Sequence, residues 1–273
     1  MAKRKRSPDE KVIDRRRKEG RGYGRGANYK PWLRIQDVPS QGLVTRICGW
    51  KTGRIHHLLS KLELFYFLTL EWTSEVIDIR EQFPLDLEET LAIAKDLGVT
   101  HPVDRNTKYP SVRTADFLIT TKGPVSSNDH ARTTKYVKDL SERQMELFEI
   151  ERVYLALRSI TWGIVTEEDI DFTLAENVKW VHPYRDISRH KQLTNECVRR
   201  VETVLAPQLM NEKKPLSALT ADCDNKLGLK TGMSLAIVRH LIANRRLQPN
   251  MKNLIEPRKI LTLNSIPTIL LPQ

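Results

Sequence analysis

The sequence predicts an α/β protein, in which a mixed β-sheet flanked by helices is followed by a smaller, separate domain. Strand-like and helix-like spacings of apolar residues alternate between about residues 46 and 166, as expected for a sheet covered by helices. Beyond about residue 175 the spacing is mainly helical. The charge balance changes at similar places, so three segments are expected: a flexible basic arm (1–30), a main domain (31–175) and a C-terminal domain (176–273).

Each element of the main domain follows from its local pattern. Residues 46–50 and 54–57 flank Gly53 and predict a hairpin, and residues 58–72 are too long and too apolar for a strand and predict a buried helix. Further strands are predicted over 76–80, 115–120, 131–137 and 161–166. Further helices are predicted over 85–97 and 141–159, where apolar residues return at helical spacing.

The C-terminal domain has the pattern of a winged helix-turn-helix. Helices are predicted over 193–210, over 216–227 and from about residue 232 onward, with extended stretches over 253–255 and 260–262. Gly228 is expected to close the second helix, and Ser234 is the candidate N-cap of the third. A helical accessory domain that contacts other proteins is the alternative interpretation.

Charge is distributed unevenly along the chain. Residues 1–30 contain twelve Lys or Arg against four Asp or Glu, residues 31–175 contain 17 against 22, and residues 176–273 contain 16 against eight. Basic segments favour a polyanionic partner such as nucleic acid, because neutralising phosphates releases counterions. Arg239, Arg245 and Arg246, expected on the last helix, are the candidate DNA-contacting side chains.

Several protein classes are disfavoured by simple features. No run approaches the roughly 18 consecutive apolar residues of a membrane span, and no apolar segment follows the basic N-terminus as it would in a secretory signal. Cys48, Cys197 and Cys223 are scattered and include no CxxC pair, so neither a disulfide framework nor a zinc site is expected. These features indicate a cytoplasmic protein with reduced thiols.

Three polar residues interrupt otherwise apolar elements of the main domain. Glu63 lies on the helical face of Leu59 and Phe67, where a carboxylate is costly unless a cation or a partner neutralises it. Asp116 begins an apolar strand and Lys135 lies in the next one, so the two can converge at one end of the sheet. Two carboxylates and a lysine suit Mg²⁺-dependent phosphodiester hydrolysis, because Mg²⁺ binds carboxylate oxygens and lysine can orient or deprotonate the attacking water.

Six short segments of the main domain are distinctive. They are KTGRIHHLLS (51–60), LEL (62–64), DIREQFPL (78–85), HPV (101–103), DFL (116–118) and EIER (149–152). Together they resemble TnsA, the endonuclease family of TnsABC-type transposons. The resemblance extends from about residue 31 to residue 169, and the run that ends at Pro84-Leu85 is specific.

The resemblance implies a restriction-endonuclease-like core in which Glu63 is the catalytic acid, Asp116 binds metal and Lys135 is the catalytic lysine. Glu63 and Asp116 would both be metal ligands. The implied ion is Mg²⁺, with Mn²⁺ as the alternative.

One position departs from the family pattern. The family has a Gln two positions before its Lys, and Thr133 occupies that position here. The Thr133 hydroxyl or backbone carbonyl is then the expected third ligand. A shifted register would offer Tyr136 and Lys138 in place of Lys135.

The resemblance also implies the reaction and its partners. The protein would cut transposon-end DNA at the 5′ ends of the transposon, while the DDE transposase TnsB cuts and joins the 3′ ends. The AAA+ ATPase TnsC would bind the C-terminal region. The rival functions are a non-catalytic DNA-binding adaptor, favoured by the Thr in place of Gln, and a stand-alone restriction or repair nuclease.

Overall fold

The computed structural model describes residues 8–38, 43–104, 106–124, 126–190, 192–211 and 213–265. The chain forms two compact units, Met1–Ile170 and Asp171–Gln273, each described by itself below. The division precedes helix α5 (Phe172–Val181), whereas the expected boundary at 175/176 would cut through that helix. The sequence signal for α5 was missed.

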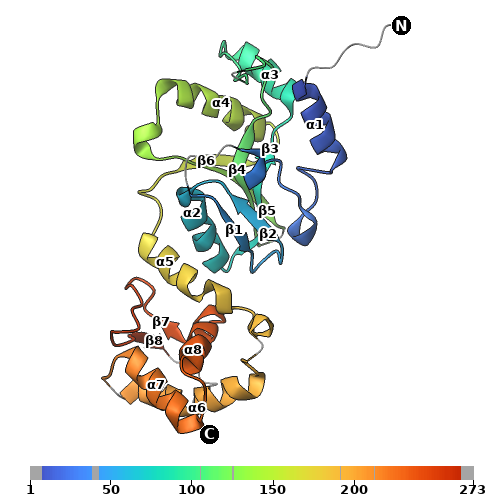
Figure 1. The fold of residues 1–273 in the computed structure, drawn as a ribbon. Helices are drawn as coiled ribbons and strands as arrows, with labels where there is room; N and C mark the ends of the chain where they lie inside the picture. Colours follow the sequence, from blue (N-terminus) through green and yellow to red (C-terminus); the bar gives the residue numbers. More distant parts are fainter. Residues whose placement is uncertain are drawn as a thin grey trace. The chain divides into compact units, whose positions relative to one another are not determined.

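The first unit is a mixed α/β structure, as predicted (Figure 1). Its helices are α1 (Pro8–Lys18), α2 (Lys61–Trp72), α3 (Leu87–Asp96) and α4 (Glu142–Ala156), with short 3-10 turns η1 (Gly26–Asn28), η2 (Ile35–Asp37) and η3 (Val137–Asp139). Its strands are β1 (Thr45–Cys48), β2 (Ile55–Leu58), β3 (Val76–Pro84), β4 (Thr114–Thr121), β5 (Asn128–Thr134) and β6 (Thr161–Val165). The four-stranded sheet has the order β3-β4-β5-β6, antiparallel except for the parallel pair β5–β6.

Helices pack on both faces of this sheet. On one face, Tyr66 of α2 contacts Phe117 of β4 edge-on, with 5.6 Å between ring centroids. On the other, a buried cluster joins α3 and α4 to the sheet; it contains Leu85, Ile93, Ala94, Ala115, Leu118, Ala131, Ile150, Tyr154 and Leu155. Phe117 and Leu118 are adjacent on β4, so alternation points their side chains to opposite faces of the sheet.

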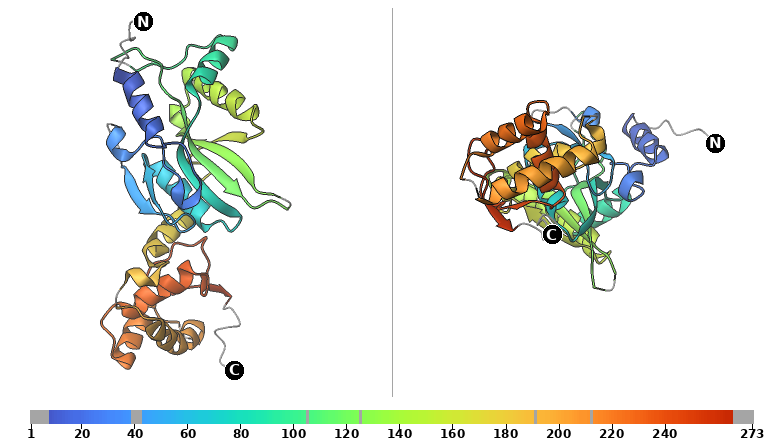
Figure 2. Two further views of the ribbon diagram at one scale, coloured as in Figure 1. Left: turned by 90° about the vertical axis from the view of Figure 1, so that its right-hand side faces the viewer. Right: turned by 90° about the horizontal axis from the view of Figure 1, so that it is seen from below.

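Two strands differ in extent from the prediction. β5 covers Asn128–Thr134 rather than 131–137, because its antiparallel pairing with β4 starts at the tip of the hairpin, where Thr121 is opposite Asn128. Figure 2 shows this hairpin extending outward from the sheet. β3 continues to Pro84, which is tolerated because Pro84 lies at the end of a strand on the edge of the sheet.

The expectation of a flexible arm over residues 1–30 is wrong from Pro8 onward. Residues Pro8–Lys18 form α1, and Tyr29 and Trp32 are each 3% exposed. The Tyr29 hydroxyl donates to the Glu81 carbonyl (3.1 Å) and the Trp32 N–H donates to the Gln82 carbonyl (3.2 Å). This segment therefore covers the outer edge of β3. Burial of its aromatic rings stabilises it, although its Gly- and Arg-rich composition predicted a flexible arm.

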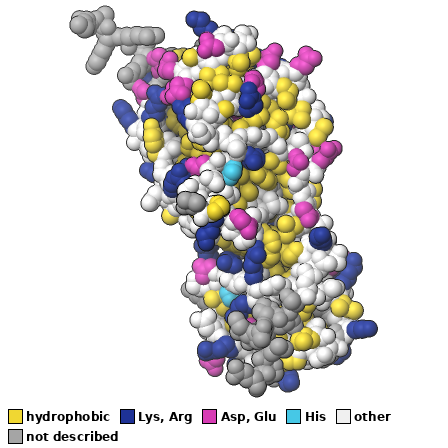
Figure 3. Space-filling view, turned by 180° about the vertical axis from the view of Figure 1, so that it is seen from behind, with side chains coloured by type: hydrophobic (Ala, Val, Ile, Leu, Met, Phe, Trp, Pro, Cys, Tyr) yellow, Lys and Arg dark blue, Asp and Glu magenta, His cyan; other side chains and the backbone are white. Residues whose placement is uncertain are grey.

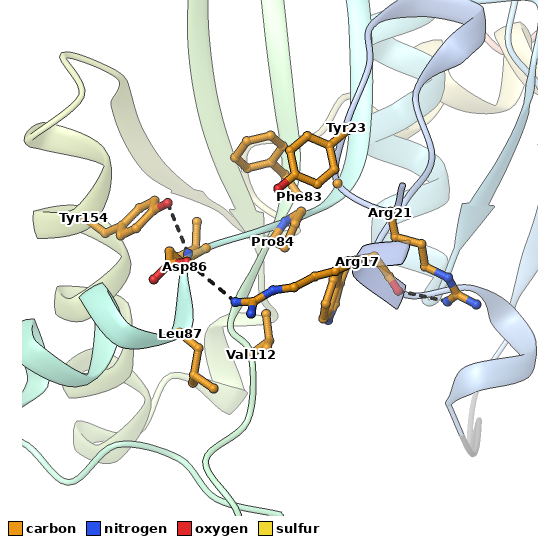
Figure 4. Close-up of a pocket in the computed structure, with 12 residues that line it drawn as sticks. Arg17, Arg21, Tyr23, Phe83, Pro84, Asp86, Leu87, Val112 and Tyr154 are labelled. Atoms are coloured by element: carbon orange, nitrogen blue, oxygen red, sulfur yellow. Dashed lines mark hydrogen bonds and ion pairs between the residues drawn. The ribbon is translucent and has the colours of Figure 1, made fainter. Parts of the chain in front are cut away.

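A cavity of about 210 Å³ lies between this N-terminal segment and the end of β3. Tyr23 and Phe83 line it, together with Tyr154 of α4 (Figure 4). Arg17 of α1 makes an ion pair with Asp86 at 3.7 Å, and the Asp86 N–H donates to the Tyr154 hydroxyl at 3.1 Å (Figure 4). The N-terminal segment thus also contacts the start of α3.

The second unit is mainly helical. Its elements are α5, the 3-10 turns η4 (His182–Tyr184) and η5 (Ile187–Arg189), α6 (Asn195–Asn211), α7 (Leu216–Leu227), α8 (Met233–Ala243) and the antiparallel pair β7 (Gln248–Pro249) and β8 (Leu263–Ser265). Gly228 ends α7 in the left-handed conformation (φ +64°), as predicted. None of the described helices of either unit is both long and apolar enough to cross a membrane.

Two details of the second unit were predicted wrongly. Gly232, and not Ser234, is the N-cap of α8, because Asp224 of α7 accepts hydrogen bonds from both the Gly232 N–H (2.7 Å) and the Ser234 N–H (2.8 Å). The extended stretches at 253–255 and 260–262 are not strands; the two strands lie at β7 and β8.

The packing of the N-terminal segment is testable with two tyrosines. Tyr29→Ala should lower the free energy of unfolding by about 3 kcal/mol, because it leaves a buried cavity and removes the hydrogen bond to Glu81. Tyr23→Ala is the matched control, since Tyr23 is 67% exposed and should change stability by less than about 0.5 kcal/mol. Equal denaturant midpoints for both variants would show that the segment does not pack as described.

Candidate active site

Glu63 is fixed in the first turn of α2. The Ser60 hydroxyl oxygen, the N-cap of this helix, accepts a hydrogen bond from the Glu63 N–H (3.0 Å). The Glu63 carboxylate oxygen Oε2 accepts from the Leu59 N–H (2.9 Å) and from Nε2 of Gln82 (3.3 Å). Glu63 is only 5% exposed. Both of these hydrogen bonds end on Oε2, and the Ser60 side chain also interacts with the carboxylate.

Asp116 is held in a similar way on β4. Its Oδ2 accepts from the Thr134 N–H (2.7 Å) and from the Thr134 hydroxyl (2.9 Å). Phe117 is paired with Arg132, which places Asp116 opposite Thr133 on the neighbouring strand. Both of these hydrogen bonds to Asp116 end on Oδ2.

Lys135 follows the last residue of β5. Its N–H donates to the Val165 carbonyl (2.9 Å), and its positive charge acts to lower the pKa of Asp116. Lys138 instead lies in the exposed turn η3, with its ammonium 5.7 Å from the centroid of the Tyr136 ring. Neither lysine lies in a strand, because β5 ends at Thr134 and not at residue 137 as predicted. Of the two lysines, Lys135 is the one whose charge acts on Asp116.

Thr133 makes contacts other than those expected of a metal ligand. Its hydroxyl donates to Oε2 of Glu151 (2.9 Å) and accepts from Nε1 of Trp162 (3.4 Å). Glu151 is fully buried on α4 and also accepts from the Arg113 guanidinium. In this structure the Thr133 hydroxyl thus anchors Glu151.

The three acids influence one another. Burial, and then the negative charge of Asp116, raise the pKa of Glu63 to about 8, against the effect of its hydrogen bonds. Burial also raises the pKa of Asp116, although Thr134, Arg113 and Lys135 oppose it. Burial raises the pKa of Glu151 to about 7 despite its ion pair with Arg113, and Asp116 adds to the shift. Asp116 is therefore the acid whose charge acts on both of the others.

Glu151 and Gln82 are site residues that the sequence interpretation missed. Glu151 is four residues after Leu147 and three before Tyr154, so it lies on the apolar stripe of its helix. A carboxylate on an apolar face is the signal that identified Glu63, and it would have identified Glu151 as well. Gln82 lies in a distinctive motif but carries no comparable signal, because its role depends on contacts across the sheet.

The three candidate DNA-contacting arginines do not share a helix face. α8 ends at Ala243, so Arg245 and Arg246 follow it, and none of the residues of α8 is exposed. The Arg239 guanidinium lies 3.9 Å from the centroid of the Tyr184 ring and donates to the Trp180 carbonyl. These contacts pack α8 against α5 and η4, and a DNA contact by Arg239 stays a prediction.

The other two arginines lie in the turn after α8. Arg245 is exposed, with φ +57°, and Arg246 is half-buried and makes an ion pair with Glu202 of α6. On the face drawn in Figure 3, Lys and Arg side chains of the second unit lie at several separate places. The three arginines are thus not presented on one exposed face of α8.

Comparisons with known proteins show which family the chain belongs to. Residues 73–167 match the family described as TnsA-like endonuclease N terminal, and residues 169–251 match the family described as TnsA endonuclease C terminal. The chain is also 40% identical over 250 residues to the Transposon Tn7 transposition protein TnsA of Escherichia coli, which covers 89% of this chain and 87% of that protein. The chain belongs to the TnsA endonuclease family.

Proposed function

We propose that this chain is the metal-dependent DNA endonuclease subunit of a Tn7-like transposition machine, which hydrolyses phosphodiester bonds at the 5′ ends of the transposon. The observation that carries this proposal is the pair of acids Glu63 and Asp116. They are close enough for the charge of one to raise the pKa of the other, and each is held in place by hydrogen bonds to its carboxylate. Membership of an endonuclease family supports the same reaction.

The chemistry of the donor set fits Mg²⁺, or Mn²⁺ as the alternative. Two repelling, buried carboxylates are costly unless a cation lies between them, and Mg²⁺ is usually bound in proteins by one or two carboxylates together with waters and substrate phosphate. Among the described residues no group of three or more His, Cys, Asp or Glu is arranged to hold a metal. We assign Glu63 and Asp116 as ligands because the charge of Asp116 acts on Glu63, with the Thr133 carbonyl as the remaining candidate from that residue.

Each side chain then has a distinct task. A bound Mg²⁺ would supply Lewis-acid stabilisation of the charge that develops on the phosphate. Lys135, half-buried beside Asp116, orients or deprotonates the attacking water. Glu151 of α4 accepts hydrogen bonds from Arg113, which precedes β4, and from Thr133 near the end of β5. These contacts hold α4, the start of β4 and the end of β5 together.

The arrangement of the first unit supports a restriction-endonuclease-like core. The acid-bearing helix α2 precedes three antiparallel strands, and α4 leads to the parallel strand β6. In the second unit, α6, α7 and α8 followed by the β7–β8 pair have the order of a winged helix. We propose that this unit contacts transposon-end DNA, the ATPase partner, or both, through surfaces other than α8.

The partners follow from the family. The E. coli relative is a Tn7 transposition protein, and we propose that this chain works in the cytoplasm with the DDE transposase TnsB and the AAA+ ATPase TnsC. A non-catalytic adaptor remains the rival function because Thr133 replaces the family Gln. Cleavage assays on site variants separate the two.

Asp116→Ala tests the catalytic assignment. It should lower the rate of 5′-end cleavage by more than about 100-fold, because the effect of losing a metal ligand exceeds that of losing a residue that only positions one. Asp129→Ala is the control, since Asp129 is a half-buried acid of the same sheet that pairs with Arg80 instead. Nicking of transposon ends by Asp116→Ala at the wild-type rate would refute the proposed function.

The two lysines near the end of β5 give a second test. Lys135→Ala should slow cleavage by about 100-fold or more, in the range for a lost general acid or base. Lys138→Ala should stay within about twofold of wild type, because Lys138 is exposed on η3. Loss of cleavage in Lys138→Ala alone would support the shifted register with Tyr136 and Lys138.

Arg245 gives a test of DNA contact by the second unit. If it contacts a phosphate, Arg245→Ala should weaken binding to all DNA sequences and reduce the slope of log affinity against log salt by about 1. Lys259→Ala is the control, because Lys259 is exposed in the same unit and pairs with Glu256. An unchanged slope in Arg245→Ala would favour a protein-binding surface, to be checked by pull-down with the ATPase.

A further inference from the structure

Gln82 has an unusual backbone conformation for a residue inside a strand. Its φ is +50°, in the left-handed region that L side chains seldom adopt. Among the described residues, the other non-glycine positions with positive φ are Lys108, Ser159 and Arg245, and none of these lies in a strand. Strained backbone inside a regular element tends to mark a functional position, because the surrounding structure must maintain it.

The position of Gln82 relates it to both candidate metal-binding acids. Glu81 is opposite Phe117 and Phe83 is opposite Ala115, so Gln82 lies opposite Asp116 on the adjacent strand. Its side chain reaches the other acid, with Nε2 3.3 Å from Oε2 of Glu63. Gln82 therefore lies between the two carboxylates, although it belongs to neither of their elements.

Each polar group of Gln82 has a defined partner. The amide oxygen Oε1 accepts from the Thr114 hydroxyl (3.2 Å), which orients the amide so that its N–H groups face Glu63. The backbone carbonyl accepts from the Trp32 N–H (3.2 Å). Gln82 is 3% exposed, and an apolar side chain would fill this space without the cost of burying an amide. The amide is thus directed specifically at the Glu63 carboxylate.

We propose that Gln82 is a positioning residue for metal binding: its amide fixes Oε2 of Glu63 and so turns Oε1 toward the cation site shared with Asp116. This inference rests on the proposed function. Groups that hold a metal ligand through its second oxygen or nitrogen set its orientation, and their loss costs roughly 10–100-fold in metal affinity or activity. Thr114 assists by orienting the amide.

The test compares four variants of the full-length chain. Gln82→Met keeps the length of the side chain and removes the amide, and Gln82→Glu keeps its shape and Oε1 but removes the N–H donor. Thr114→Val removes only the hydroxyl that orients the amide. Thr90→Val is the matched control, because the Thr90 hydroxyl is buried and bonded to the Asp86 carbonyl (2.9 Å) at the start of α3, away from the acids.

Three quantities are measured for each variant. They are Mn²⁺ affinity by calorimetry on the protein alone, the Mg²⁺ concentration for half-maximal transposon-end cleavage with the partner transposase, and the affinity for transposon-end DNA. Both Gln82 variants should lose about 10-fold or more in Mn²⁺ affinity, and their half-maximal Mg²⁺ concentration should rise in proportion. Thr114→Val should show a smaller loss and Thr90→Val none. In Gln82→Met, DNA affinity and the thermal midpoint of the metal-free protein should stay close to wild type, which a purely structural role for Gln82 does not predict. Gln82→Glu should lower that midpoint, because it places a third carboxylate beside Glu63.

The outcomes separate this inference from the proposed function. Wild-type metal affinity and Mg²⁺ dependence in Gln82→Met would overturn the role of Gln82, even if Asp116→Ala is inactive. Losses of equal size in Thr90→Val would also overturn it, because they would reflect general destabilisation. Normal cleavage by Asp116→Ala would instead refute the active site itself.

Discussion

One buried carboxylate, that of Glu81 on β3, connects the parts of the first unit that position the site. It is fully buried and accepts hydrogen bonds from the Arg54 guanidinium, from Nδ1 of His56 (2.8 Å) and from the His57 N–H (3.1 Å). Burial alone would raise its pKa, but His56 and Arg54 outweigh burial and hold the pKa of Glu81 well below its ordinary value. Removing one partner of such a buried pair typically costs about 3–5 kcal/mol. The β1–β2 hairpin is thereby attached to β3.

Gln82 follows Glu81 on β3, so the hydrogen-bond network of Glu81 directly adjoins the candidate active site. Gln82 adjoins Glu81 and donates to Glu63, while the N-terminal segment bonds to the backbone carbonyls of both Glu81 and Gln82. The rigid charge network therefore lies one residue away from the strained backbone at Gln82. This proximity explains how a strained conformation can persist at the edge of the sheet.

The negative charges of the acids at the candidate site lower folding stability, because burial and mutual repulsion disfavour them. Because the pKa of Glu63 is raised to about 8, the metal-free protein gives up stability as pH rises from the ordinary range of a Glu carboxyl, about 4.3, toward that value. A cation bound by both carboxylates, as proposed above, would remove this penalty and would couple metal binding to folding stability. Thr133, at the position of the family Gln, serves this arrangement indirectly through its bond to Glu151.

The sequence by itself determined the class of the fold, the order of the elements in the main domain and the candidate acids Glu63 and Asp116. These depend on short-range patterns: apolar spacing sets helix or strand, and a carboxylate on an apolar face is visible within a few residues. Only the tertiary structure decided that the basic N-terminal segment packs on β3, that Arg239 packs against aromatic rings, and that Gln82 and Glu151 contact residues of the candidate site. Each of these depends on a partner at least 18 residues away in the chain, as for Glu151 and Thr133. Local periodicity carries no information about which distant residue will neutralise a charge or cover a strand edge.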